Sequence, residues 1–164
     1  MPITTSPSPM SVLDTDPRVG RAQDPRQWDF ETAHMALLHE KYDLGGARLP
    51  MPLNAERMHE RLECLSEELT ELATAVLEDD FPGMVDALVD LVVFAKGTAV
   101  LLGLPWAALF DDVMRANNGK VRGVGHRGHA VDLVKPPGWV GPKTEDILAR
   151  HGWRPARSDE GGGR

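Results

Sequence analysis

The sequence is poor in the residues that cross-link a small protein or bind nucleic acid. Its 164 residues include one cysteine, Cys64, so no internal disulfide and no cysteine-rich zinc site can form. A net charge of −7 argues against a nucleic-acid-binding protein, because phosphate contacts need clustered lysine and arginine. The most apolar stretch, residues 91–104, contains Lys96 and has only 14 residues, too few to span a bilayer. The N-terminal residues lack the continuous apolar core of a signal peptide. We therefore expect a cytoplasmic protein with no membrane partner.

The rest of the composition fits one domain of ordinary globular type. Apolar residues make up 41% of the chain and charged residues 26%. Residues 1–23 contain four prolines among serines and threonines, which predicts a flexible N-terminal tail. The glycine-rich residues 154–164 predict a second flexible tail. The folded domain is then expected to span residues 24–153.

The spacing of apolar residues and of helix-breaking residues predicts an all-α fold. Residues 119–143 contain six glycines and three prolines, which indicates a long loop, and no segment is convincing as a strand. The expected architecture resembles a four-helix bundle with a long basic loop and a short C-terminal helix. The expected helices run from about 25 to 42 after Asp24, from an Asn54 cap to a turn at residues 79–80, from 82 to 102, from 105 to 117, and from a Thr144 cap to 150.

The second expected helix carries an acidic run beside an apolar stripe. Glu68 and Glu71 are three residues apart and are therefore neighbours on the helix surface. At about 100° per residue, Glu68 lies roughly 80° and Glu71 roughly 140° from the stripe centre, so both should flank the core, while Glu67 points away from it. Alone, these glutamates could also be an ordinary solvated helix face. The stripe consists of Met58, Leu62, Leu65, Leu69, Leu72 and Val76.

The third expected helix is apolar on every side, which predicts burial on all faces. Its only charged residues are Asp86, Asp90 and Lys96, and the two aspartates are four apart on one face. A carboxylate on a buried helix is costly unless it is paired or binds a metal. Asp86 could instead be a first-turn acid favoured by the helix dipole, an explanation that suits Asp90 less well. Hard oxygen ligands from the two helices would favour Mg²⁺, or Mn²⁺, over zinc.

The pattern Glu67-Glu68-x-x-Glu71, followed by an acid-bearing apolar helix, resembles the MazG-like all-α nucleotide pyrophosphohydrolase superfamily. That group includes MazG, dimeric dUTPases and phosphoribosyl-ATP pyrophosphohydrolase, and its signature reads EExxE, a spacer, then ExxD. Residues 86–104 resemble the second signature helix, although Ala87 stands where the family has glutamate and Asp86 lies one residue earlier.

Two further segments resemble the family. The segment with Arg115, Asn117 and Lys120 resembles a nucleotide-contacting R-x-N-x-x-K helix end, and Lys135 to Trp139 resembles a K-P-x-G-W loop. The resemblance covers roughly residues 54–148. The resemblance implies that Arg115, Asn117, Lys120, Lys135 and Trp139 bind the substrate.

The resemblance also implies the chemistry. The expected reaction is Mg²⁺-dependent hydrolysis of a nucleoside triphosphate between the α- and β-phosphates, which yields a nucleoside monophosphate and pyrophosphate. By resemblance the metal ligands are Glu68, Glu71 and Asp90, with Asp86 as a further ligand, and Glu67 is either the general base or another ligand.

Charge placement supports an anionic substrate independently of the resemblance. Residues 115–135 contain five basic residues against the single acid Asp132, a local charge of +4 in a chain of −7. Such a segment can bind phosphates, although a solvated surface loop would also explain it. The basic residues are Arg115, Lys120, Arg122, Arg127 and Lys135.

Two other functions stay open. The chain could be a non-catalytic helical interaction module. Ala87, at the position of the family's glutamate, favours this interpretation. A ferritin-like di-iron protein would use the pairs Glu31–His34 and Glu56–His59, but Glu56 and Glu68 would lie about 18 Å apart on one helix and could not serve one iron pair. The apolar third helix also predicts a homo-oligomer, either a homodimer or a dimer of dimers.

Overall fold

The computed structural model describes residues 29–123 and 132–155. The expected N-terminal tail and most of the expected C-terminal tail lie outside these ranges. The chain divides into two compact units, which meet in the sequence between Leu104 and Pro105. The expected single domain of residues 24–153 includes parts of both and stays a prediction. Within the two ranges, no helix is long and apolar enough to cross a membrane.

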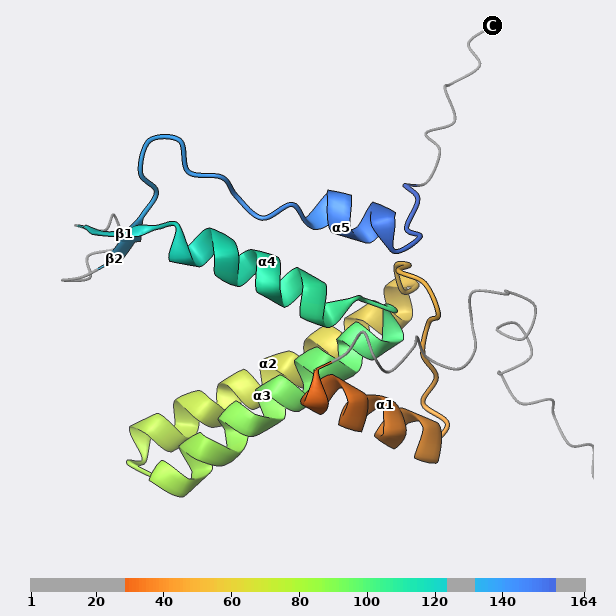
Figure 1. Cartoon of the computed structure of the whole chain (residues 1–164). Coiled ribbons are helices and arrows are strands. Elements are labelled where there is room, and N and C mark those ends of the chain that lie inside the picture. Colours follow the sequence, from red (N-terminus) through yellow and green to blue (C-terminus); the bar gives the residue numbers. More distant parts are fainter. Residues whose placement is uncertain (1–28, 124–131, 156–164) are drawn as a thin grey trace, which may run out of the picture. The chain divides into compact units, whose positions relative to one another are not determined.

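The first unit consists of three helices, α1 (Phe30–Lys41), α2 (Ala55–Leu77) and α3 (Phe81–Leu101). Helices α2 and α3 form a hairpin and run side by side, and α1 packs on α3 (Figure 1). Asn54 caps α2 as expected, because its side chain accepts a hydrogen bond of 2.7 Å from the backbone N–H of Arg57. Asp80 caps α3 by the same kind of bond from Gly83 N–H.

The start of the first helix differs from the prediction. Asp29 is the N-cap of α1, and its carboxylate accepts a hydrogen bond of 2.8 Å from Thr32 N–H. The expected cap, Asp24, lies outside the described residues. The same carboxylate forms an ion pair of 2.6 Å with Lys96 on α3. A long-range partner therefore helps to fix where this helix begins, and local sequence could not reveal it.

The buried face of α2 also differs from the expected stripe. Leu62, Leu69 and Val76 are 53%, 58% and 56% exposed, whereas Glu68 is only 8% exposed and Ala75 only 7%. The helix is thus turned so that Glu68 lies in the packed face instead of flanking it. Helical spacing identified the apolar positions, but it could not tell which of them face α3.

Helices α1 and α3 approach closely at Gly97. A Cβ atom at this position would lie 3.1 Å from Nε2 of His39, so only glycine fits the contact without a shift. His39 is 5% exposed, and its Nδ1 lies 3.0 Å from the carbonyl oxygen of Gly45. This buried imidazole links α1 to the segment that follows it.

One arginine ties α2 to α3. The Nε of Arg61 donates to Thr98 Oγ1 and its Nη2 donates to the carbonyl oxygen of Phe94, both at 3.0 Å. Its guanidinium also lies 5.0 Å from the centre of the Phe94 ring. These contacts hold the two acid-bearing helices at a fixed register.

The second unit contains α4 (Trp106–Asn118), the short strands β1 (Val121–Gly123) and β2 (Asp132–Val134), and α5 (Thr144–Arg150). The strands pair antiparallel, with Val121 opposite Val134, so the expectation of no strand was wrong. Segments of three residues are too short to show an alternating pattern. Thr144 is the first residue of α5 and not its cap. The fold class is nevertheless confirmed as all-α, since helices dominate the described residues and the only sheet there is this pair.

Candidate functional site

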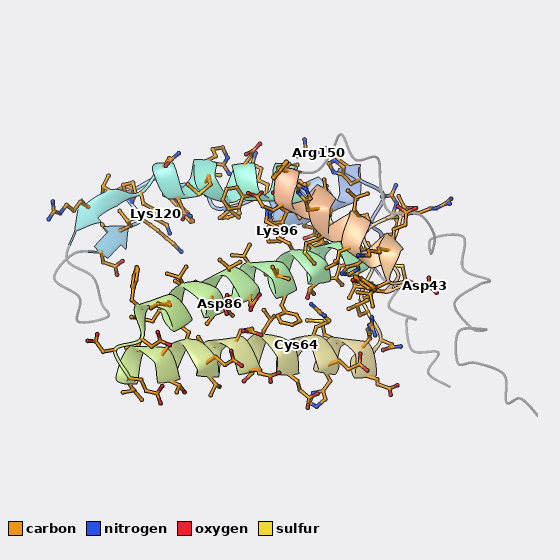
Figure 2. The ribbon with its side chains drawn as sticks, turned by 90° about the horizontal axis from the view of Figure 1, so that it is seen from below. Asp43, Cys64, Asp86, Lys96, Lys120 and Arg150 are labelled. Carbon is orange, nitrogen blue, oxygen red and sulfur yellow. The ribbon has the colours of Figure 1, made fainter. Side chains whose placement is uncertain are left out.

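The acidic residues of α2 and α3 come together around Glu68. Its side chain is buried in the packed face of α2, and its Oε2 atom has no hydrogen-bond partner among the described residues. Figure 2 labels Asp86 on α3, the helix that runs beside α2. A buried carboxylate oxygen without a donor costs free energy, so this atom needs a partner that the described side chains do not supply.

The charges around Glu68 are all of one sign. Burial raises the pKa of the Glu68 carboxyl above its usual value, and the negative charges of Glu71, Asp90, Glu67 and Asp86 raise it further, in that order. The other four acids predicted from the sequence are therefore near enough to act on the Glu68 carboxylate. We call these five residues the acidic cluster.

The members of the acidic cluster differ in exposure. Asp90 is half-buried, whereas Glu67, Glu71 and Asp86 are exposed. Ala87, which stands at the position of the family's glutamate, is 3% exposed and belongs to the core. The acid at position 86 therefore lies on the accessible side of α3, while the residue at position 87 packs inside.

The donor set of the acidic cluster fits a hard divalent cation. Carboxylate oxygens suit Mg²⁺ or Mn²⁺. A cation would also provide the missing partner of Glu68 Oε2 and offset the mutual repulsion of the acids. In the arrangement of residues 29–123 and 132–155, however, no three acidic, histidine or cysteine side chains are gathered closely enough to enclose one ion.

A second group of predicted residues lies in the second unit, around Trp139. The indole Nε1 of Trp139 donates a 2.6 Å hydrogen bond to the carbonyl oxygen of Ala116 near the end of α4. The ammonium groups of Lys120 and Lys135 lie 5.9 Å and 4.7 Å from the centre of the Trp139 ring. We call Lys120, Lys135 and Trp139 the basic platform. Within the described residues neither lysine forms an ion pair with a carboxylate, so both can receive an anion.

The remaining predicted substrate residues are placed differently. Asn117 is half-buried, and its backbone carbonyl accepts a hydrogen bond from Lys120 N–H. Arg115 donates from Nε to Asp112 Oδ1 at 2.7 Å and from Nη2 to the carbonyl oxygen of Gly141 at 2.9 Å. Asp112 was not expected to matter. Its position three residues before Arg115 on one helix was the signal that could have revealed it.

The described part of the chain does not assemble a di-iron set. Glu31 pairs with Lys96 at 3.3 Å, and His34 Nδ1 lies 3.1 Å from the carbonyl oxygen of Phe30. His59 faces Glu63 on its own helix at 3.3 Å. Glu31, His34 and His59 therefore each have a partner other than a shared metal site.

Comparison with known proteins finds a match over the region that contains the acidic cluster. Residues 38–117 match the family model of phosphoribosyl-ATP pyrophosphohydrolase. The resemblance to the MazG-like nucleotide pyrophosphohydrolase superfamily is thereby confirmed. The matched region contains all of α2, α3 and the acidic cluster, and it ends before Lys120. It indicates a pyrophosphohydrolase that acts on nucleotides. Among curated proteins, none matches the chain.

Proposed function

We propose that this protein hydrolyses ribo- or deoxyribonucleoside triphosphates between the α- and β-phosphates, in a Mg²⁺-dependent reaction that releases a nucleoside monophosphate and pyrophosphate. The single observation that carries the proposal is Glu68. A buried carboxylate oxygen with no donor, surrounded by four other acids, is hard to explain in a purely structural helix pair. It is readily explained as one ligand of a divalent cation.

The acidic cluster has defined roles in this proposal. Glu68, Glu71 and Asp90 hold the cation, and Asp86 is a further ligand that takes the place of the family's glutamate. Mg²⁺, or Mn²⁺, when bound polarises the phosphate oxygens and lowers the pKa of a coordinated water. Glu67 is exposed on α2, free of the packed face, and serves as the general base that accepts a proton from the attacking water.

The basic platform supplies positive charge to the substrate. Lys120 and Lys135 neutralise phosphate oxygens, and Asn117 provides a polar contact at the end of α4. Trp139 gives an aromatic surface on which two ammonium groups already gather, so anion binding there needs little rearrangement. Arg122 extends the same charge along β1, while Arg127 lies outside the described residues.

We further propose that the protein is a homodimer or a dimer of dimers. The face of α3 away from α2 exposes Val85, Leu88, Val89 and Val92 by 45–55%, and with α1 it borders a groove of about 460 Å³. An apolar face of this kind is unusual on a monomer and typical of helix–helix association. Light scattering tests the idea, and a monomeric mass would contradict it.

A non-catalytic helical module is the second candidate, because Ala87 replaces the family's glutamate and the part of the chain that the structure describes forms no closed ligand set. Calorimetric titration with Mg²⁺ and an α,β-imido nucleoside triphosphate separates the two. Hydrolysis predicts metal-dependent binding of the nucleotide, whereas the module predicts none. Pyrophosphate release from a panel of triphosphates then tests the reaction itself.

A further inference from the structure

The loop that follows β2 is tied to α4 at three points. Trp139 donates its indole N–H to the carbonyl oxygen of Ala116. Arg115 donates to the carbonyl oxygen of Gly141. The backbone N–H of Lys143 donates to Asp112 Oδ2 at 2.5 Å. Loops usually depend on their own turns for shape, so three anchors from a single helix indicate that the position of this loop matters.

These anchors use three of the five N–H donors of Arg115, one on each nitrogen of the guanidinium. Nε donates to Asp112 and Nη2 to Gly141, and Nη1 lies 3.5 Å from the carbonyl oxygen of Val140. The hydrogen bond from Arg115 keeps the pKa of the Asp112 carboxyl below its usual value, and the hydrogen bond from Lys143 N–H adds to the effect. The Asp112 carboxylate therefore stays charged throughout the neutral pH range.

The ring of Trp139 lies against the anchored backbone. A Cβ atom at Gly141 would lie 3.3 Å from Cζ3 of Trp139, so the glycine backbone and the indole are in close contact. Fixing the Gly141 carbonyl therefore fixes the indole from one side, while Ala116 fixes it from the other. Lys135, whose ammonium lies over the same ring, is held in the same way.

We propose that Asp112 and Arg115 form a latch that locks the loop of residues 136–143 onto α4 and so sets the positions of Trp139 and Lys135 beside Lys120. Arg115 is in this view a positioning residue and not a phosphate ligand. If the guanidinium turned to a phosphate, it would leave Asp112 and the Gly141 carbonyl oxygen, and this would release the loop that carries Trp139. The proposal rests on the proposed function, because it assigns the basic platform to the polyphosphate.

The latch can be tested without any substrate. The indole N–H of Trp139 is observed by ¹H–¹⁵N NMR and assigned by its loss in Trp139→Phe. Arg115→Ala and Asp112→Ala should each accelerate hydrogen exchange of this indole N–H by about tenfold or more, since either change opens the loop. Arg150→Ala, which removes an exposed arginine of α5, is the control and should leave the exchange rate unchanged. Unchanged exchange in both latch variants would overturn the proposal.

Binding of inorganic tripolyphosphate, measured by calorimetry in the presence of Mg²⁺, tests the functional consequence. Arg115→Ala and Asp112→Ala should each bind tripolyphosphate about tenfold more weakly than the wild type. The double variant should lose no further affinity, because both changes open one latch. The opposite result would be tighter binding in Asp112→Ala with weaker binding in Arg115→Ala. It would show that Asp112 competes with phosphate for Arg115, which overturns the positioning role.

Two controls keep the outcomes separate. Arg115→Lys keeps the charge but cannot bridge Asp112 and Gly141 together, so it should behave like Arg115→Ala if the latch is correct. If wild-type protein binds no tripolyphosphate, the proposed role of the basic platform fails. The exchange measurement then still decides whether the latch exists.

Discussion

Replacing Arg61 with methionine is expected to weaken the contact between α2 and α3. Arg61 makes two charge-assisted hydrogen bonds of 3.0 Å and lies over the Phe94 ring. Hydrogen bonds to a charged group contribute about 1.5–3 kcal/mol each, and an aromatic contact of this kind about 0.5–1 kcal/mol. Against this, burial lowers the pKa of Arg61, which shows that its charge has lost part of its hydration.

The loss on replacement is smaller than the sum of these contacts. Thr98 Oγ1 also donates to the carbonyl oxygen of Phe94 at 2.8 Å, so neither acceptor is left without a partner when the arginine is removed. Methionine restores most of the apolar contact and carries no buried charge. We expect the free energy of unfolding to fall by about 2 kcal/mol.

The change is measured by urea unfolding followed by far-ultraviolet circular dichroism. Arg57→Met is the matched control, because Arg57 lies one turn earlier and its pair with Glu60 is exposed. Exposed pairs contribute about 0.2–1 kcal/mol, and the bond from Arg57 to the Leu44 carbonyl oxygen is also exposed, so the control should lose less stability than Arg61→Met. Equal destabilisation by the two substitutions would refute the role given to Arg61.

Two further predictions use titratable groups. The pKa of Glu68 is raised in the folded protein. Its negative charge therefore opposes folding at a pH above 4.5, the usual pKa of this side chain. In metal-free buffer at pH 7, Glu68→Gln should therefore melt at a higher temperature than the wild type, and this difference should disappear below pH 4. The variant should also lose Mg²⁺ binding. A lower melting temperature than the wild type at pH 7 would contradict the prediction. Burial lowers the pKa of His39. The hydrogen bond to Gly45 opposes this shift, and the charges of Arg61 and Arg57 add to it. The neutral ring is therefore the form that favours folding. Stability should then fall as pH drops below about 6.5, and His39→Gln should show a flatter pH profile in thermal unfolding.

The helices could be predicted from the sequence because their ends are marked locally. Asn54 caps α2, and the glycines and prolines around residues 103–105 separate α3 from α4. The acidic residues could be identified as well, because their spacing and the family signature agree. These features depend on residues only a few positions apart.

Features that depend on distant partners could not be predicted. Leu69 and Glu68 are adjacent, and only the packing of α3 decides that the glutamate is buried and the leucine is exposed. Asp29 caps α1 with support from Lys96, which is 67 residues away in the chain. Asp112 gains its importance from a loop about 30 residues later. In each case the local pattern allows several arrangements, and tertiary contacts select one.

Pyrophosphate release from a panel of nucleoside triphosphates, with Mg²⁺ and with chelator, tests the central claim most directly. The account predicts turnover of at least one triphosphate that stops when the metal is removed. Asp90→Asn should lose at least about 100-fold in activity, since it withdraws a charged ligand beside Glu68. Asp79→Asn makes the same chemical change in the exposed α2–α3 turn, where φ is 56° and asparagine is tolerated, and should keep full activity. No turnover by the wild-type protein, or full activity in Asp90→Asn, would contradict the account.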